Sequence, residues 1–308
     1  MVAGGRPFEH VQARLPLLLW MGILIGLGWV MVFSTATVPG AGMAGGGVFF
    51  HLKRQVLATL LGAVAMIFAA RVPLARLERL MPRLLACAAG LMLLVFVPGM
   101  GKSVARATRW INLGVVSFQP VEVFKLTVIL GYAGLLAGAD ARASWPLPLW
   151  GRVAGLAVAS VGFPILQRDF GSAVLMLTMG GAMIWLAGAR ARDLAGFGAA
   201  AGCLAGAALV SAPYRMHRVQ QYFAAWGGHG GGGYQTQQSL IALGAGGFFG
   251  VGLGESTQKL YYLPSAHADF IFAIIGEELG FLGAFATLGL HVLLLREGLA
   301  IAREAGGR

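Results

Sequence analysis

Long apolar runs recur along this sequence, and they restrict the chain to folds that can exist inside a lipid bilayer. A helix of about 20 consecutive apolar residues is long enough to cross the hydrocarbon core. Eight runs are candidates, of which the third and the fifth are short and the fifth contains Pro164. They cover residues 15–37, 48–70, 84–98, 120–138, 153–166, 170–188, 194–212 and 270–295.

These runs favour helices over a transmembrane β-barrel. Barrel strands alternate apolar and polar positions over about ten residues, whereas the runs here are continuously apolar. Charged residues make up 11% of the chain, against about 25% in soluble domains. The sequence therefore predicts an all-α fold, a polytopic membrane bundle of about eight transmembrane helices.

Basic residues in the connecting segments set the expected orientation, because cytoplasmic loops carry an excess of Lys and Arg. With the N-terminus in the cytoplasm, most short basic loops fall on the cytoplasmic side and both termini lie inside. The net charge of +11 partly reflects this topology, so it is a poor indicator of nucleic acid binding. The arginines of the expected cytoplasmic side are Arg6, Arg14, Arg71, Arg76, Arg79, Arg83, Arg142, Arg152, Arg190, Arg192, Arg296 and Arg303.

Residues 213–268 then form a large extracytoplasmic loop between the seventh and eighth helices. The loop begins with a basic and aromatic stretch, 213–223, which contains Arg215 and Arg218. Such a stretch is typical of a helix that lies beside lipid headgroups, and an ordinary amphipathic connector fits equally well. A loop of this length is unusual and often functional.

Carboxylates on the outer side are the first candidates for chemistry, since an ionisable group within a membrane span is costly and marks function by default. Glu122 and Lys125 are three residues apart and share a helix face. This spacing predicts a neutralising salt bridge, a place in a polar cavity, or both. Six of the twelve acidic residues lie on the outer side: Glu122, Asp169, Glu255, Asp269, Glu277 and Glu278.

Two of these aspartates stand where helices are expected to begin. Asp169 lies in a tight turn after the fifth run, where an N-cap of the sixth helix is the favoured interpretation. Asp269 opens the eighth helix, either as an N-cap or as a catalytic carboxylate. Glu277 is eight residues further along and shares its face, which suggests a polar stripe that enters the bundle.

The six histidines are scattered, and none forms a metal-binding pair at helical spacing. His267 and Asp269 could touch a metal ion together, but a histidine satisfied within the loop is the favoured interpretation.

Several blocks of the sequence resemble the SEDS family, the shape, elongation, division and sporulation proteins. The most specific block covers residues 252–280, and its details are closer to the division branch, FtsW, than to the elongation branch, RodA. Shorter blocks follow in the family's order at 108–114, 118–125, 167–171 and 234–239.

The resemblance implies a single membrane domain over residues 1–308 and a peptidoglycan glycosyltransferase activity. Such proteins polymerise lipid II into glycan strands on the outer face of the bacterial cytoplasmic membrane during septal synthesis. They act beside a class B penicillin-binding transpeptidase and other division proteins. The family's essential aspartate corresponds to Asp269, its buried Glu/Lys pair to Glu122 and Lys125, and its cavity aspartate to Asp169.

The implied reaction needs one carboxylate base and a cationic environment. Asp269 would take the proton of the acceptor sugar hydroxyl during attack on the anomeric carbon. The leaving lipid pyrophosphate needs stabilisation by Arg or Lys, or by a divalent cation such as Mg or Mn. No organic cofactor is implied. The expected substrate-binding and pyrophosphate-binding residues are Glu122, Lys125, Asp169, Arg109, Trp110, Lys259, His267, Gln235, Glu277, Arg215 and Arg218.

Three features depart from the family's pattern. Ala268 stands where the family usually has threonine, and Arg168 stands where it usually has proline before the cavity aspartate. The family has ten helices, so the chain is expected to be truncated after eight. Two other functions therefore stay open: a lipid-linked precursor flippase or transporter, and an inactive scaffold that recruits the transpeptidase.

Overall fold

The computed structural model describes residues 15–36, 49–104, 107–112, 117–137, 145–211, 233–260, 262, 263, 266 and 268–304, together with six residues between 213 and 223. Contacts within the chain divide it into two compact units, each described separately below. The first unit combines residues 1–69 with 219–307, and the second unit covers residues 70–218.

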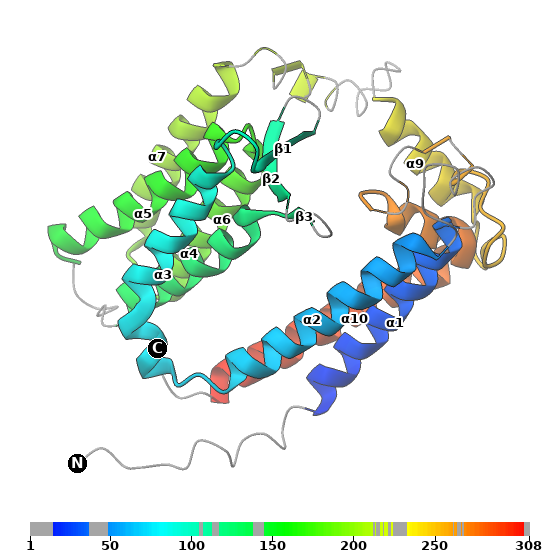
Figure 1. The fold of residues 1–308 in the computed structure, drawn as a ribbon, viewed down its shortest axis with the longest axis horizontal. Helices are drawn as coiled ribbons and strands as arrows, with labels where there is room; N and C mark the ends of the chain where they lie inside the picture. Colours follow the sequence, from blue (N-terminus) through cyan, green and yellow to red (C-terminus); the bar gives the residue numbers. More distant parts are fainter. Residues whose placement is uncertain are drawn as a thin grey trace. The chain divides into compact units, whose positions relative to one another are not determined.

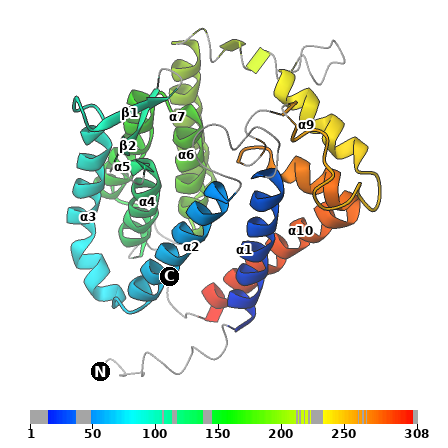
Figure 2. The ribbon, with the colours of Figure 1, turned by 45° about the vertical axis from the view of Figure 1, so that its right-hand side comes forward.

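The second unit is a helical bundle with a small sheet at one end (Figure 2). Helix α4 is central, because it packs against α3, α5 and α6. Its apolar side chains form the core of the unit, where Phe124, Val128 and Tyr132 are fully buried. The helices are α3 (Leu74–Leu94), α4 (Pro120–Leu136), α5 (Leu147–Leu166), α6 (Phe170–Leu186) and α7 (Ala191–Val210).

The sheet lies between α3 and α4 in the chain and was not predicted. Its strands are β1 (Gly101–Val104), β2 (Ala107–Asn112) and β3 (Ser117–Phe118), in the antiparallel order β1-β2-β3. Ile111 pairs with Phe118 and is buried, which ties the sheet to the start of α4. The predicted helical membrane fold is confirmed, with this sheet as an addition to the all-α expectation.

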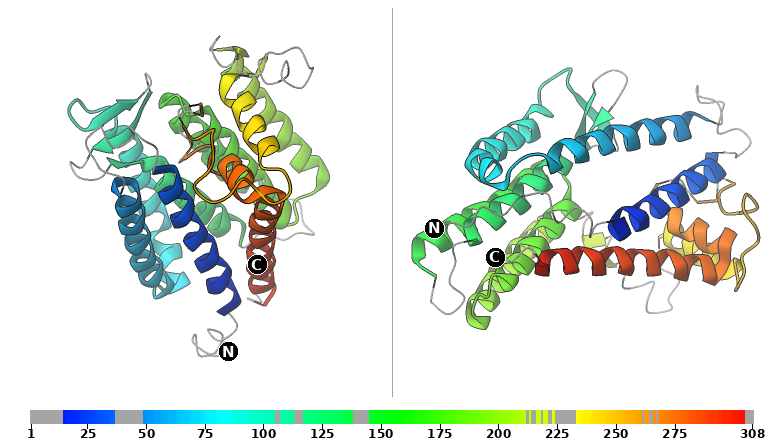
Figure 3. Two further views of the ribbon diagram at one scale, coloured as in Figure 1. Left: turned by 90° about the vertical axis from the view of Figure 1, so that its right-hand side faces the viewer. Right: turned by 90° about the horizontal axis from the view of Figure 1, so that it is seen from below.

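The first unit contains α1 (Leu15–Ala36), α2 (Phe50–Ala70), α9 (Tyr234–Ala245) and α10 (Ile271–Glu304). Both α1 and α9 pack on α10 (Figures 1 and 3). The side chains of Met31, Ala242 and Ile274 meet in one buried apolar cluster. Helix α2 is joined to α1 by a hydrogen bond from Trp29 Nε1 to Thr59 Oγ1, 3.3 Å long.

Helix α10 is broken at Gly280, whose backbone angles are φ 68° and ψ −166°. Segment 246–252 fills the break with backbone hydrogen bonds. The N–H groups of Val251 and Gly252 donate to the carbonyls of Glu277 and Glu278, at 2.9 and 3.0 Å. On the far side of the break, the N–H groups of residues 281 and 282 donate to the carbonyls of residues 247 and 248. A break at membrane depth is tolerated when its polar groups are satisfied by protein in this way.

Two glycines make this close approach possible. A Cβ atom at Gly250 would lie 2.2 Å from the carbonyl oxygen of Glu278, and one at Gly280 would lie 2.3 Å from the backbone nitrogen of Gly250. Both residues also have positive φ, which side-chain-bearing residues rarely adopt.

Each of the eight predicted runs overlaps a helix, but three boundaries were wrong by six residues or more. Helix α10 continues to Glu304 rather than ending near residue 295. Helix α3 begins at Leu74 rather than residue 84, so Arg76, Arg79 and Arg83 lie on a helix and not in a loop. Helix α5 begins at Leu147 rather than residue 153 and continues through Pro164. Backbone hydrogen bonds do not depend on side-chain polarity, so a helix can extend beyond its apolar window.

Within the described residues, five helices are long and apolar enough to cross a membrane by length and composition: α1, α2, α5, α7 and α10. Helices α4 and α6 are shorter, at 17 residues each, and α3 carries charges in its first turns.

The expected loop 213–268 contains α9. Of its basic stretch the structure describes Pro213, Met216, His217, Val219, Gln220 and Phe223, whereas Arg215 and Arg218 lie outside the described residues.

We predict that Gly280→Ala destabilises the protein by roughly 1–3 kcal/mol or more, since it adds backbone strain and a steric clash. The apparent melting temperature in detergent measures the effect. Gly289→Ala is the matched control, because it lies in the same helix and its added Cβ would meet no atom within 4 Å. Equal melting temperatures for the two variants would contradict the role assigned to the break.

Candidate functional site

The second unit gathers polar side chains where the sheet, α3 and the α5–α6 turn meet. Arg109 on β2 donates from Nε to the carbonyl of Gln167 at 3.3 Å and from Nη2 to the carbonyl of Arg168. Its Nη1 lies 3.9 Å from Oδ1 of Asp169. The side chain of Arg109 remains 34% exposed. A guanidinium carries five N–H groups, so donors remain for an anionic ligand.

The turn that positions Asp169 is a Schellman motif at the end of α5. Asp169 N–H donates to the carbonyl of Pro164 at 2.8 Å, and Arg168 N–H donates to that of Ile165 at 2.9 Å. Arg168 adopts a left-handed conformation, with φ 59°. The turn is also tied to α3, because buried Gln167 donates from Nε2 to the carbonyl of Met92 at 2.8 Å.

Asp169 caps α6, as its position predicted. Its carboxylate accepts from the backbone N–H of Ser172 at 3.3 Å and from the Ser172 hydroxyl at 2.7 Å. The N-cap interpretation is confirmed. The Oδ1 atom that accepts from the Ser172 N–H is also the one that lies 3.9 Å from Nη1 of Arg109. The expected place in a substrate cavity stays a prediction.

Glu122 and Lys125 form the predicted salt bridge, with 2.8 Å between Oε2 and Nζ. Glu122 lies in the first turn of α4, after Pro120 at the helix start. A carboxylate is favoured there by the helix dipole. The Lys125 side chain is mostly buried at 18% exposure, whereas that of Glu122 is 58% exposed.

In the first unit, Asp269 is exposed just before α10. The N–H groups of Ala273 and Ile274 both donate to the carbonyl of Phe270, so Phe270 occupies the N-cap position. Within the described part of the chain, no residue donates a hydrogen bond to the Asp269 carboxylate. The structure therefore does not show Asp269 as the N-cap of α10, and its carboxylate is available to a ligand.

Glu277 and Glu278 are buried, each with 1% exposure. Glu277 accepts hydrogen bonds from residues 256–258, and Glu278 forms an ion pair with buried Lys259 at 2.8 Å. The expected polar stripe is not shown, because Asp269 lies before α10 and is exposed, whereas Glu277 is enclosed within the helix. Sequence analysis missed Ser34, which donates to Glu278 at 2.6 Å from a helix 244 positions away.

For the remaining predicted site residues, the structure gives only their location and exposure. Trp110 lies on β2 and is partly buried, Gln235 is exposed in the first turn of α9, and Glu255 is exposed. His267 lies outside the described residues. In the described part of the chain, no three or more His, Cys, Asp or Glu side chains gather closely enough to hold a metal ion.

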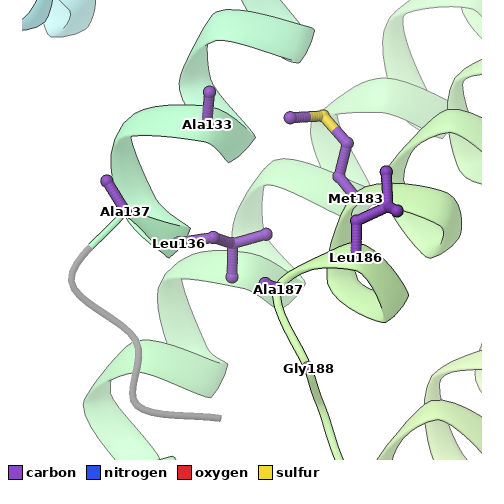
Figure 4. Close-up of a pocket in the computed structure, with 7 residues that line it drawn as sticks. All are labelled: Ala133, Leu136, Ala137, Met183, Leu186, Ala187 and Gly188. Atoms are coloured by element: carbon purple, nitrogen blue, oxygen red, sulfur yellow. The ribbon is translucent and has the colours of Figure 1, made fainter. Parts of the chain in front are cut away.

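An apolar pocket of about 420 Å³ opens at the C-terminal ends of α4 and α6, the opposite ends of these helices from Glu122 and Asp169 (Figure 4). The side chains that line it carry no charge and no strong hydrogen-bonding group for a sugar or a phosphate. They belong to Ala133, Leu136, Ala137, Met183, Leu186, Ala187 and Gly188.

Comparisons with known proteins agree with the motif resemblance. A family model described as cell cycle protein, covering FtsW, RodA and SpoVE, matches residues 14–308. The probable peptidoglycan glycosyltransferase FtsW of Halorhodospira halophila is 39% identical over 278 residues, which cover 89% of this chain and 69% of that protein. Its counterpart in Thioalkalivibrio sp. is 40% identical and covers 91% of this chain and 70% of its own.

Two solved structures share the fold. One, from a peptidoglycan synthase complex that coordinates polymerization and crosslinking, superposes with a TM-score of 0.70 at 27% identity, covering 93% of this chain and 77% of that one. The rod shape determining protein RodA of Thermus thermophilus gives a TM-score of 0.62 at 26% identity, with 93% and 74% covered. This multi-pass helical membrane protein belongs to the FtsW/RodA/SpoVE family of cell cycle proteins, the SEDS family that its motifs resemble.

Proposed function

We propose that this chain is a peptidoglycan glycosyltransferase that polymerises lipid II into glycan strands during septal cell-wall synthesis. The two relatives quoted above, at 39% and 40% identity, are each named as a probable peptidoglycan glycosyltransferase FtsW. The observation that carries the proposal is Asp269, an exposed carboxylate with no donor among the described residues. It follows a loop whose Lys259 binds Ser34 of α1 and Glu278 of α10.

The reaction transfers one glycosyl group and one proton. The acceptor sugar hydroxyl loses its proton to the Asp269 carboxylate while its oxygen attacks the anomeric carbon of the donor. The bond from that carbon to the lipid pyrophosphate breaks, and the pyrophosphate leaves with the bonding electrons. A single displacement inverts the anomeric centre, so an α-linked donor gives a β-linked glycan.

The leaving pyrophosphate needs cationic stabilisation, and two candidates for an anionic ligand are described within the second unit taken by itself. Arg109 keeps free N–H donors and a third of its side chain exposed. Lys125 can balance charge beside Glu122. A divalent cation stays part of the proposal, but the described residues assemble no metal site of their own. Such an ion would take its ligands mainly from the pyrophosphate, and the steps above use side chains alone.

The proposed setting is the bacterial cytoplasmic membrane at the division septum, with the N-terminus in the cytoplasm and the loop 213–268 outside. A class B penicillin-binding transpeptidase and other division proteins are the proposed partners. The fold shared with a chain of a peptidoglycan synthase complex supports this choice.

A lipid-linked precursor transporter is the second candidate, and one observation favours it. Transporters often bind substrate at discontinuous helices, and α10 is discontinuous at Gly280. However, the carboxylates beside this break are already bound by protein groups. The glycosyltransferase is therefore preferred over the transporter.

We predict that Asp269→Asn abolishes polymerisation of purified lipid II by the chain together with its transpeptidase partner in detergent. The amide keeps the shape of the side chain but cannot accept the proton. Glu255→Gln, which removes an exposed carboxylate of the same loop, is expected to keep wild-type activity. Glycan strands from Asp269→Asn would refute the general-base assignment. No strands from the wild type would instead favour the scaffold.

A second prediction concerns the salt bridge on α4. Glu122→Ala leaves the mostly buried Lys125 ammonium without its partner, and a stranded charge destabilises the protein and disturbs its surroundings. We expect lower polymerisation and a lower melting temperature. Glu78→Ala removes an exposed carboxylate from α3 of the same unit and serves as the control. If both variants match the wild type, the pair has no part in the site.

A further inference from the structure

The loop before Asp269 is fastened to α10 through two consecutive glutamates. The carboxylate of Glu277 accepts from the hydroxyl of Ser256, from the N–H and hydroxyl of Thr257 at 2.9 and 3.0 Å, and from the N–H of Gln258 at 3.3 Å. Four donors from three successive residues fix both the position and the direction of the chain there.

Glu278 fastens the same loop through Lys259. The Lys259 ammonium donates to Glu278 Oε1 at 2.8 Å, to the Gly254 carbonyl at 2.6 Å and to the Ser34 hydroxyl at 3.1 Å. A lysine ammonium has three N–H donors, so none is left for a phosphate oxygen. With side-chain exposures of 4% and 0%, Lys259 and Glu278 are enclosed by the protein.

The backbone of these glutamates holds the adjoining part of the loop. Their carbonyls accept the N–H groups of Val251 and Gly252. Each glutamate thus binds the loop twice, once through its carbonyl at 251–252 and once through its carboxylate at 256–259. Because the loop enters the break at Gly280, these contacts fix its register on α10.

The far end of the loop is anchored by apolar contacts. Leu263 and Ala266, with 3% and 7% exposure, join the buried cluster that contains Ile274 and Met31. Asp269 follows three residues after Ala266, and α10 begins two residues later. The backbone of Asp269 is therefore held between this anchored loop and the start of α10.

We propose that Lys259, Glu277 and Glu278 are positioning residues that hold residues 250–260 in the break of α10 and thereby fix the Asp269 carboxylate for proton transfer. The proposal rests on the glycosyltransferase function proposed above. It gives Lys259 and Glu277 a role in holding the loop, in place of the expected contact with substrate.

Charged residues suit this task better than apolar ones. Between residues 252 and 258 the loop is made of Gly, Leu, Glu, Ser, Thr and Gln, and Leu253 there is exposed. Few apolar contacts can therefore select one register. A buried charge is costly without its partner, so every arrangement that separates Lys259 from Glu278 is disfavoured.

The reaction of a buried thiol with a maleimide tests whether these residues hold the loop, and it requires no enzymatic assay. The reporter is Ala266→Cys in a chain whose exposed cysteines, Cys87 and Cys203, are replaced by alanine. Because Ala266 is 7% exposed, the thiol should react slowly with a maleimide. Tyr262→Cys, at a position that is 56% exposed, gives the rate of an open site. Adding Lys259→Met should raise the Ala266→Cys rate at least about tenfold, toward this reference.

The double variant Lys259→Met with Glu278→Gln separates positioning from direct chemistry. It leaves no buried charge unpaired, and the amide at 278 can still accept from Ser34. Protection should return to within about threefold of the wild type. Polymerisation should follow the same order: low in Lys259→Met, and largely restored in the double variant. A lysine that bound pyrophosphate could not be rescued by neutralising its partner.

Three outcomes would overturn the proposal or part of it. Unchanged protection in Lys259→Met would show that the ion pair does not hold the loop. Restored protection without restored polymerisation would assign Lys259 a direct role in the reaction. If the wild type makes no glycan, the proposed function fails, but the maleimide reaction rates still show whether the ion pair holds the loop. Should Lys259→Met fail to fold, Ser34→Ala, which removes one neutral donor to Glu278, should give an intermediate rate.

Discussion

The architecture of the first unit depends on one constraint, which is that backbone polar groups inside a bilayer must find partners within the protein. Helix α10 is interrupted at Gly280, and segment 246–252 supplies the missing donors and acceptors. This pairing needs backbone-to-backbone contact, which glycines at 250 and 280 allow. It also brings residues 254–259 beside Glu277 and Glu278, so the buried polar network is a consequence of how the break is filled.

The spans could be predicted from sequence because hydrocarbon imposes a simple length rule on apolar helices. The same rule explains the errors. It detects the part of a helix that lies in hydrocarbon, whereas α3 and α5 continue into regions where Arg76, Arg79 and Arg152 are tolerated. The hydropathy of the sequence did not predict the three-stranded sheet. Its strands have two to six residues, and their pairing depends on contacts between separate short segments.

Local side-chain interactions were also predictable, since spacing determines them. The pair Glu122 and Lys125 follows from three residues along one helix, and the Asp169 cap follows from its place before α6. The network of Ser34, Lys259 and Glu278 has no such signature, because its members come from α1, a loop and α10. Helical spacing related Asp269 to Glu277, but Asp269 lies before α10, and spacing could not show that one carboxylate is exposed and the other is saturated.

The turn at Arg168 shows how a departure from the family pattern can be physically consistent. Proline, the family's usual residue there, has φ near −65° and no N–H. This turn has φ 59° at position 168 and uses its N–H to bind Ile165. The sequence and the turn thus agree, since proline could not adopt this Schellman geometry. The carbonyls of Gln167 and Arg168 face the Arg109 guanidinium, which they orient beside Asp169. Arg168 therefore accompanies a particular way of holding Arg109, whose guanidinium remains partly exposed.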